Sequence, residues 1–330
     1  MSVNKDKRYL DYSSYIKKRF DQRVQKISIN AGFTCPNLDG TKSRGGCNYC
    51  NNNTFNPFYC KPVKPVLTQI EEGISFFAQK YKTQEYIAYF QAFSNTYAET
   101  SHLEKLYLEA LSHPQVIGLA ISTRPDCIHP DNLELMTQLA KKYYISLEIG
   151  IESTYNPTLE AINRCHSFEE TVNAFELAKD RNLHLGGHLI LGLPGENKEI
   201  LLSHAEKINL LPIEILKIHH LQIVKHTMMA FQYKNDPDMF QLFGLEDYID
   251  LVTDFISMVR PDIILGRFTS ESPAKYLIAP KWNGLKNFEI TSMIDKALIH
   301  KNLWQGKNYQ NPVARNIDGN IELKSLDLCH

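Results

Sequence analysis

The sequence lacks several features that mark whole classes of protein. Its net charge is close to zero, because 36 Lys and Arg residues stand against 37 Asp and Glu residues, so no overall positive field favours nucleic acid. No run approaches the roughly 18 consecutive apolar residues of a membrane-spanning helix. The polar amino-terminal stretch also lacks the apolar core of a signal peptide. We therefore expect a cytoplasmic protein that makes no membrane contact.

The composition that remains is typical of a folded globular protein. The chain has 330 residues, of which 43% are hydrophobic and 22% are charged. A chain of this length suffices for one large domain or two smaller ones, and it needs no disulfide or metal for stability alone. This composition excludes a disordered, collagen-like or coiled-coil chain.

Cysteine is scarce and unevenly spaced. The chain has seven cysteines, and this odd number in a reducing cytosol argues against a disulfide framework. Four are scattered along the sequence: Cys60, Cys127, Cys165 and Cys329. The other three, Cys35, Cys47 and Cys50, lie close together. Their clustering indicates metal binding or catalysis.

Short apolar runs alternate with longer segments of helical period along most of the chain. The expected strands are residues 25–30, 86–93, 116–123, 146–151, 184–191 and 213–221. The expected helices are residues 68–80, 100–112, 130–142, 168–182, 198–210, 245–259 and 290–301. Strands that alternate with helices at a spacing of roughly 30 residues predict βαβ units and a parallel sheet. Six units are too few for a closed eight-stranded barrel, so the predicted α/β fold is a partial (β/α)6 barrel.

The predicted domain division follows from this alternation. Residues 1–24 form a basic and aromatic helical segment, residues 25–225 form the partial barrel, and residues 226–330 form an α-rich extension that closes the barrel. Functional residues of such folds gather at the carboxyl ends of the strands. Polar clusters stand at these places, in residues 33–53, 94–97, 122–126 and 152–153.

The cysteine loop reads C-P-N-L-D-G-T-K-S-R-G-G-C-N-Y-C, from Cys35 to Cys50. Its last two cysteines can chelate one metal, and glycine turns in the loop can return Cys35 to them. A structural zinc ion takes four ligands, and only Cys60 offers a fourth nearby. Three thiolates suit a [4Fe–4S] cluster that keeps one iron open. The pattern favours such a cluster, with a zinc knuckle or a redox pair as alternatives.

These three cysteines, the aromatic Tyr49 before the last of them, and the partial barrel resemble the radical S-adenosylmethionine (SAM) superfamily. The usual spacing there is C-x3-C-x2-C. Here eleven residues separate Cys35 from Cys47. This longer loop resembles that of a subgroup of the superfamily, which is similar to the Elongator catalytic subunit and the oxygen-independent coproporphyrinogen oxidases. The resemblance implies one [4Fe–4S] cluster held by the three cysteines. It also implies reductive cleavage of SAM to a 5′-deoxyadenosyl radical.

The resemblance further implies which residues surround SAM. Arg164, in the stretch I-N-R-C-H, matches an arginine that pairs with the SAM carboxylate, and Glu152 replaces a ribose-binding glutamine. Ser122 stands where relatives carry a carboxylate, and the residues after the second strand replace a glycine-rich turn. The implied SAM-contacting residues are Tyr49, Ser94, Asn95, Thr96, Ser122, Glu152, Arg164, Ile190, Gly192 and Gly195.

The sequence also offers candidates on the substrate side. Lys217 and His219 share one face of the sixth strand, and Arg267 adds positive charge near the expected barrel mouth. We expect these three residues to act on or bind the substrate. The implied partners are an external electron donor of the flavodoxin or ferredoxin type and a tRNA, modified at its wobble uridine.

The amino-terminal segment allows two interpretations. Its basic residues are interleaved with the aromatic residues Tyr9, Tyr12, Tyr15 and Phe20. Such a segment can lie along RNA with stacked bases, or it can pack as an amphipathic helix. The alternative functions are a radical SAM enzyme with a small-molecule substrate, a non-catalytic zinc-dependent RNA-binding module, and a cluster protein that only transfers electrons.

Overall fold

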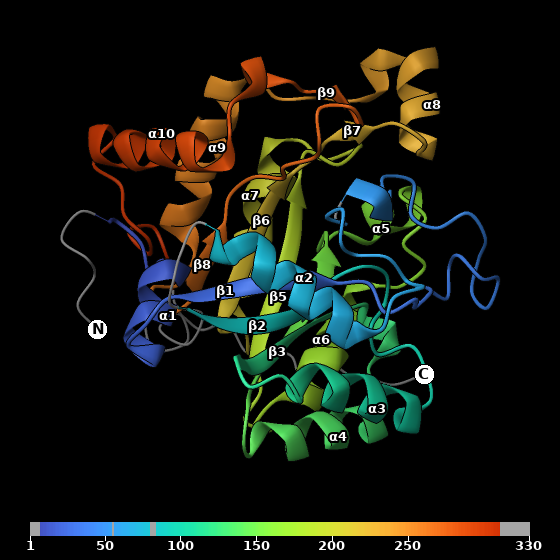
Figure 1. Cartoon of the computed structure of the whole chain (residues 1–330). Helices are drawn as coiled ribbons and strands as arrows, with labels where there is room; N and C mark the ends of the chain where they lie inside the picture. The colour runs from blue at the N-terminus through green and yellow to red at the C-terminus, as the bar shows by residue number, and fades with distance from the viewer. Residues whose placement is uncertain (1–6, 55, 80–83, 311–330) are drawn as a thin grey trace, which may run out of the picture.

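The computed structural model describes residues 7–54, 56–79 and 84–310, and its centre is a curved sheet of seven strands (Figure 1). The strands are parallel and lie in the order β1-β2-β3-β4-β5-β6-β8. Their bounds are β1 (Val24–Ile29), β2 (Glu85–Phe90), β3 (Val116–Thr123), β4 (Tyr144–Glu152), β5 (His184–Leu191), β6 (Ile215–His220) and β8 (Ile264–Arg267). The predicted α/β class and partial parallel barrel are confirmed.

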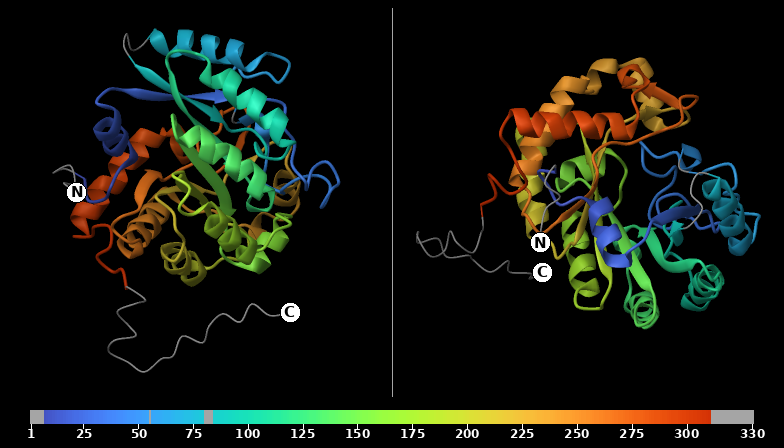
Figure 2. Two further views of the ribbon diagram at one scale, coloured as in Figure 1. Left: turned by 90° about the horizontal axis from the view of Figure 1, so that it is seen from below. Right: turned by 60° about the vertical axis from the view of Figure 1, so that its left-hand side comes forward.

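Helices on the convex outer side of the sheet return the chain from the end of one strand to the start of the next (Figure 2). Their bounds are α2 (Val66–Ala78), α3 (Thr100–Leu111), α4 (Pro130–Ala140), α5 (Asn156–Ala161), α6 (Phe168–Ala178) and α7 (Lys198–Asn209). Buried side chains such as Leu103 and Phe175 pack against strand residues such as Ile149 in one core. This arrangement leaves the carboxyl ends of the strands at one shared edge.

The sheet has one strand more than the six expected. β8 is only four residues long and lies in the region predicted to be helical, so its short apolar pattern does not stand out in the sequence. It pairs with β6, with Arg267 beside Lys217. The amino-terminal segment covers the outer edge of β8, because the Leu265 N–H donates to the Leu10 carbonyl at 2.8 Å.

Helix α1 (Tyr12–Phe20) lies beside β1 and β8, at the end of the barrel where the strands begin (Figure 1). Its Ile16 is buried among strand residues, and Phe20 packs edge-on against Tyr144 with ring centroids 5.5 Å apart. Tyr9, just before the helix, is buried against Phe268. The aromatic residues of this segment therefore pack within the protein, which favours the amphipathic-helix interpretation over base stacking.

Residues beyond β6 form a mainly helical region that covers one side of the barrel (Figures 1 and 2). Helix α9 packs on α7, and α10 packs on α9. The elements are β7 (Ile223–Val224), α8 (Met228–Asn235), α9 (Leu245–Met258), β9 (Leu277–Ala279) and α10 (Asn287–His300). Four 3-10 turns complete the described chain: Asn52–Thr54, Pro125–Cys127, Pro237–Met239 and Trp282–Gly284.

The buried Gln305 joins the two ends of the described chain. Its Nε2 donates to the carbonyls of Arg260 and Ile263 at 2.8 and 2.7 Å, and its Oε1 accepts from the Leu10 N–H at 2.9 Å. Residues 1–6 and 311–330, which belong to the predicted terminal segments, lie outside the described residues. In the part of the chain that the structure describes, no helix has the length and apolar character needed to cross a membrane.

Candidate functional site

The cysteine loop follows β1 and forms a short hairpin that returns the chain from Cys35 to Cys47. Asp39 and Arg44 pair across it in an antiparallel bridge. A tight turn then leads to the last cysteine, where the Cys50 N–H donates to the Cys47 carbonyl at 3.0 Å. The eleven residues between the first two cysteines are therefore accounted for by a hairpin.

Two asparagines hold this hairpin against the segment after α5. The buried Asn37 donates through Nδ2 to the Cys47 Sγ at 3.2 Å and to the Asn163 carbonyl at 2.9 Å. Asn163 has a φ of +55°, and its own Nδ2 donates to the Gly46 carbonyl at 2.7 Å. The Asn48 N–H also donates to the Ile162 carbonyl at 3.0 Å. These bonds fix Cys47 relative to the end of α5.

Hydrogen-bond donors also stand beside the other two thiols. The Ser94 Oγ lies 3.3 Å from the Cys35 Sγ, and the Asn52 Nδ2 lies 3.6 Å from the Cys50 Sγ. Burial raises the pKa of Cys35 and of Cys50, and in Cys50 the neighbouring Cys47 and Cys35 raise the pKa further.

Within residues 7–54, 56–79 and 84–310, no three or more His, Cys, Asp or Glu side chains gather closely enough to hold one metal ion. The thiolates of a [4Fe–4S] cluster bind different iron atoms, so they stand farther apart than the ligands of one zinc ion.

Two buried guanidinium groups stand beside Cys47. The Nη1 atoms of Arg164 and Arg124 lie 3.5 and 4.0 Å from its Sγ. Asp126 holds Arg124 through two bonds of 2.8 and 2.9 Å. Although burial raises the pKa of Asp126, Arg124 and Lys42 together hold it at about 2. The carboxylate is thus charged at neutral pH and keeps Arg124 in place.

A bulge at the end of β4 brings Glu152 to Arg164. The pairing of β4 with β5 shifts between Gly150 and Glu152, and Glu152 has a φ of +65°. Arg164 donates through Nη2 to the Gly150 carbonyl at 3.0 Å and lies 3.4 Å from the Glu152 Oε1. Burial, with the charges of Cys47 and Glu152, raises the pKa of Tyr49 well above its usual value. Tyr49, Glu152 and Arg164 therefore meet beside the thiols.

The predicted SAM residues after β2 and at the end of β3 form hydrogen bonds within the protein. Asn95 donates through Nδ2 to the Ser122 carbonyl at 2.8 Å, while its Oδ1 is buried without a described partner. The Thr96 hydroxyl donates to the Cys127 carbonyl at 2.7 Å. The Ser122 Oγ donates to the Tyr89 hydroxyl at 3.0 Å, on the interior face of the barrel. Of the residues predicted after these two strands, Ser94 is the one that contacts a thiol.

The end of β5 supplies the remaining predicted residues. Ile190 is buried in an apolar cluster against which Tyr49 packs. Gly192 has a φ of +94°, and a Cβ there would lie 3.2 Å from the ring of Phe243. Gly195 has a φ of +85°, and a Cβ there would meet nothing within 4 Å. The backbone at Gly195 is therefore open to a ligand, whereas Gly192 is covered by an aromatic ring.

A charged network fills the interior of the barrel. Glu148 on β4 is fully buried and accepts from the Lys26 Nζ at 2.6 Å, the Lys217 Nζ at 2.5 Å and the His188 Nε2 at 3.0 Å. Although burial raises the pKa of Glu148, Lys217, Lys26 and His188 hold it well below its usual value. The network thus contains one carboxylate shared by two lysines and a histidine.

The three residues predicted to act on the substrate belong to this network or border it. Burial lowers the pKa of Lys217 to about 7, even though Glu148 raises it. The His219 ring stacks on the His188 ring at 5.3 Å, and burial lowers the pKa of His219 well below its usual value. The charge of Arg267 lowers the pKa of both Lys217 and His219. The structure therefore brings Lys217, His219 and Arg267 together.

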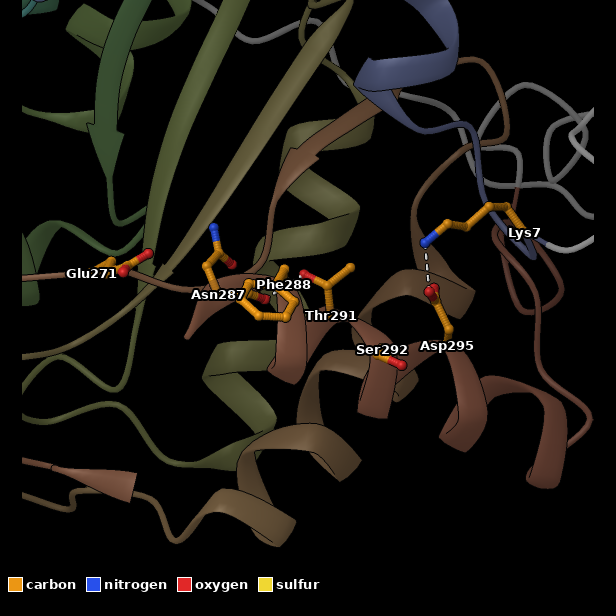
Figure 3. Close-up of a pocket in the computed structure, with 7 residues that line it drawn as sticks. All are labelled: Lys7, Glu271, Asn287, Phe288, Thr291, Ser292 and Asp295. Atoms are coloured by element: carbon orange, nitrogen blue, oxygen red, sulfur yellow. Dashed lines mark hydrogen bonds and ion pairs between the residues drawn. The ribbon is translucent and has the colours of Figure 1, made fainter. Parts of the chain in front are cut away.

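An open hollow of about 620 Å³ lies away from this network, between the amino-terminal segment and α10 (Figure 3). Lys7 and Asp295 form an ion pair of 2.5 Å at one end of it, and the exposed Phe288 lies along it. No residue of the cysteine loop or of strands β1 to β6 lines the hollow. Volume alone therefore does not identify the functional site of this chain.

Four contacting residues at the site were not assigned a role from the sequence. Asn37 carries a recognisable signal, because it belongs to the C-P-N stretch that opens the cysteine loop. Arg124 and Asp126 flank Pro125 at the end of β3, but only the folded chain places them beside Cys47. Asn163 stands within the I-N-R-C-H stretch, but nothing in the sequence of that stretch predicts its left-handed backbone conformation.

Comparisons with known proteins agree with this geometry. The profile of the Radical SAM superfamily matches residues 41–208, and that of the Radical SAM C-terminal domain matches residues 213–300. Uncharacterized protein YtqA of Bacillus subtilis is 31% identical over 93% of this chain and 94% of its own. The tRNA uridine(34) acetyltransferase of Methanocaldococcus infernus is 25% identical over 57% of this chain and 34% of its own.

A solved structure supports the same fold. Elp3 of Methanocaldococcus infernus matches 86% of this chain and 64% of its own, with a TM-score of 0.66 and 18% identity. The superfamily profile and the relative at 31% identity cover the cysteine loop region, the parallel barrel and the helical region after it. The chain therefore belongs to the radical SAM superfamily, whose members are enzymes that use a [4Fe–4S] cluster and SAM.

Proposed function

We propose that Cys35, Cys47 and Cys50 hold the [4Fe–4S] cluster of this enzyme. The observation that supports this most is that a hydrogen-bond donor of the protein stands at each sulfur atom: Ser94 at Cys35, Asn37 at Cys47 and Asn52 at Cys50. N–H and O–H groups that point at cluster ligands tune the reduction potential of the cluster. When bound, the reduced cluster supplies the electron for reductive cleavage of SAM.

The residues beside the thiols fit SAM. The Arg164 Nε is buried without a described partner, so the guanidinium has a donor to spare for the SAM carboxylate. Glu152 has a carboxylate that suits the ribose hydroxyls. Tyr49 and Ile190 offer apolar contact, and the open backbone at Gly195 suits the adenine ring. We assign these five residues to SAM binding.

An electron donor is needed by radical SAM enzymes in general. For this chain we propose a small donor of the flavodoxin or ferredoxin type, as the family resemblance implies. Such proteins carry one electron at low potential. The donor has to approach the cysteine loop, whose Arg44 is exposed and adds positive charge.

We propose a tRNA, modified at its wobble uridine, as the substrate. The support is a sequence relative whose printed name is tRNA uridine(34) acetyltransferase, although this chain spans only about a third of that protein. The shared part covers 57% of this chain and leaves out most of the relative. We therefore transfer the class of substrate and not the acetyl transfer.

The test is a comparison of tRNA nucleosides by mass spectrometry in a strain that lacks this gene. The proposal expects a changed wobble-uridine profile that the wild-type gene restores. Cys50→Ala should fail to restore it, whereas the matched variant Cys60→Ala should succeed, because the Cys60 Sγ donates to the Ser28 carbonyl away from the other thiols. An unaltered profile in the deletion strain would contradict the tRNA substrate and favour a small molecule.

A further inference from the structure

The interior of the barrel carries more positive than negative charge. Glu148 is shared by Lys26 and Lys217, and it is the one carboxylate that pairs with either of them within the described residues. Arg267 stands next to Lys217 and forms no ion pair with a described acidic residue. Two lysines therefore share one carboxylate while Arg267 has no acidic partner among the described residues, and an excess of buried charge is costly unless an anion balances it.

Solvent reaches the cations but not the carboxylate. The side chains of Lys26, Lys217 and His188 are 19%, 12% and 18% exposed, whereas that of Glu148 is 0% exposed. The ammonium groups of Lys26 and Lys217 lie 5.0 and 4.9 Å from the centre of the Tyr89 ring, which orders them without neutralising them. The positive groups therefore line an accessible space.

This space lies on the path from the cysteine loop into the barrel. Glu148 and Glu152 stand on the same strand, four residues apart, which corresponds to about 13 Å along a strand. Glu152 meets Arg164 at the mouth, so Glu148 and its lysines lie about that far inside. At the other end the barrel is closed by α1, whose Tyr12 and Ile16 pack against interior residues. Among the described residues α1 covers this end, so we expect a ligand to enter past the cysteine loop.

We infer that Lys217, Arg267 and Lys26 form a binding site for an oxyanion, either a carboxylate or a phosphate, carried by the substrate or by a small co-substrate. The inference rests on the proposed function in one respect, namely that the reaction takes place between the cysteine loop and this site. The buried His219 Nε2, which has no described partner, is available as a further neutral donor or acceptor. An oxyanion would restore the charge balance that Glu148 alone does not provide.

The alternative role for these lysines is purely structural, as partners that keep Glu148 ionised. One cation satisfies that need, and Arg267 makes no contact with Glu148 among the described ion pairs. The two roles predict different effects of removing the carboxylate.

The test is titration calorimetry of the anaerobically reconstituted full chain at constant ionic strength, with inorganic phosphate and, separately, acetate. Lys217→Met and Arg267→Met should each weaken binding at least about tenfold, the loss expected for one charge-assisted contact. Glu148→Gln should not weaken binding, because the loss of the competing negative charge offsets the lower pKa of Lys217 that follows from losing its acidic partner. The control Lys105→Met, which removes an exposed charge on α3, should bind as the wild type does.

The two ligands identify the source of the oxyanion. Phosphate binding that depends on Lys217 and Arg267 supports a phosphoryl group, and acetate binding with the same dependence supports a carboxylate. Wild-type affinity for both ligands in Lys217→Met and Arg267→Met, or no binding of either ligand to the wild type, would overturn the inference. Neither outcome concerns the tRNA proposal, which fails separately through an unaltered nucleoside profile.

Discussion

Arg164 brings together the parts of the site that come from different elements. Its guanidinium contacts Cys47 of the loop, the Gly150 carbonyl of β4 and Glu152 of the bulge. Although burial lowers its pKa, the charges of Tyr49, Cys47 and Glu152 keep the group ionised. A permanently charged donor at this position suits the carboxylate of an amino acid.

We expect Arg164→Ala to weaken SAM binding by about 2–3 kcal/mol, the range for loss of a buried charge-assisted contact. The cluster should still form, because no thiol is removed. Equilibrium dialysis of the reconstituted protein with labelled SAM measures the affinity, and iron content measures the cluster. Arg181→Ala, in the turn after α6, where the guanidinium pairs with Glu134, is the control. A SAM affinity equal to that of the control would remove Arg164 from the binding site.

Lys217 gives the oxyanion site a characteristic pH dependence. Because its pKa in the folded protein is about 7, it loses its charge as the pH rises through 7, whereas an unfolded lysine stays charged. The groups that face it are Lys26, Tyr89, Glu148, His188, His219 and Arg267. A bound anion raises the pKa of Lys217, so binding near neutral pH takes up a proton.

Acetate affinity should therefore fall between pH 6 and pH 9, a range in which acetate itself stays ionised. Calorimetry in two buffers with different enthalpies of ionisation measures the proton uptake. Lys217→Met should bind acetate weakly at every pH and take up fewer protons. If the acetate affinity of the wild type does not change with pH, Lys217 does not contact the anion, and Arg267 and Lys26 bind it alone.

Strand β4 combines the two functional regions in one element. Its interior face carries Glu148, which belongs to the oxyanion network, and its bulged end carries Glu152, which meets Arg164. Gly150 lies between them and allows the guanidinium of Arg164 to approach the backbone. A Cβ at Gly150 would lie 2.6 Å from the Arg164 Nη2 and 2.5 Å from the Glu152 Oε1.

Gly150→Ala should therefore displace Arg164 and Glu152 from their shared position. We expect SAM binding to weaken at least about tenfold and the free energy of unfolding to fall by about 1–3 kcal/mol, as is usual when an extra methyl is forced into a packed site. Gly186→Ala on β5 is the matched control, since its nearest contact is 3.4 Å. Equal SAM affinities in the two variants would show that the bulge does not shape the site.

The regular elements of the barrel were predictable because their patterns are strong. β3 and β5 occupy the predicted residues, since each is a buried apolar run bounded by turn residues. β8 was missed because four residues carry too little pattern, and α5 was missed because its six residues lie within a polar loop. Short elements are defined by the contacts they make, which a sequence does not display.

The site was predictable where it depends on motifs. The three cysteines, Arg164 and Glu152 carry family patterns, and the structure brings them together. Thr96 and Ser122 also stand at strand ends, but their hydroxyls have partners at the Cys127 carbonyl and Tyr89. The direction of a side chain at a strand end depends on local backbone turns, so position alone did not determine it.

At the scale of the whole molecule, positive charge occurs at both ends of the barrel. Lys17 and Lys18 on α1 are exposed at the end where the strands begin. Arg44 in the cysteine loop and Lys225, whose carbonyl accepts from the Asn51 Nδ2, are exposed near the mouth. A nucleotide that reaches the cluster has to approach the mouth, so we now expect RNA contacts there and not on α1.

Replacing Arg44 and Lys225 by Gln should weaken tRNA binding. It should also flatten the log–log salt dependence by about 0.7 for each single-stranded phosphate contact that is lost. The matched double variant Lys17→Gln with Lys18→Gln removes the same charge from the other end and should bind tRNA as the wild type does. Filter binding over a range of salt concentrations measures both quantities. A larger effect from the α1 variant would restore the amino-terminal segment as the RNA-binding surface.

The central claim is that Cys35, Cys47 and Cys50 hold a cluster that cleaves SAM. Two scattered cysteines serve as controls. The Cys60 Sγ donates to the Ser28 carbonyl, and burial raises its pKa to about 12. Cys127 is buried near Cys35 and Ser94, and burial likewise raises its pKa to about 12. Cys329 lies outside the described residues. Loss of any one of the three ligands should abolish the cluster, since two thiolates do not hold a cubane that already has an open iron.

The most direct measurement incubates the anaerobically reconstituted protein with dithionite and SAM and quantifies 5′-deoxyadenosine together with bound iron. The wild type, Cys60→Ala and Cys127→Ala should bind iron and form the product. Cys35→Ala, Cys47→Ala and Cys50→Ala should lose the iron and form none above background. Product from any of these three variants at the wild-type level, or a wild-type protein with a full cluster that forms no 5′-deoxyadenosine, would contradict the account.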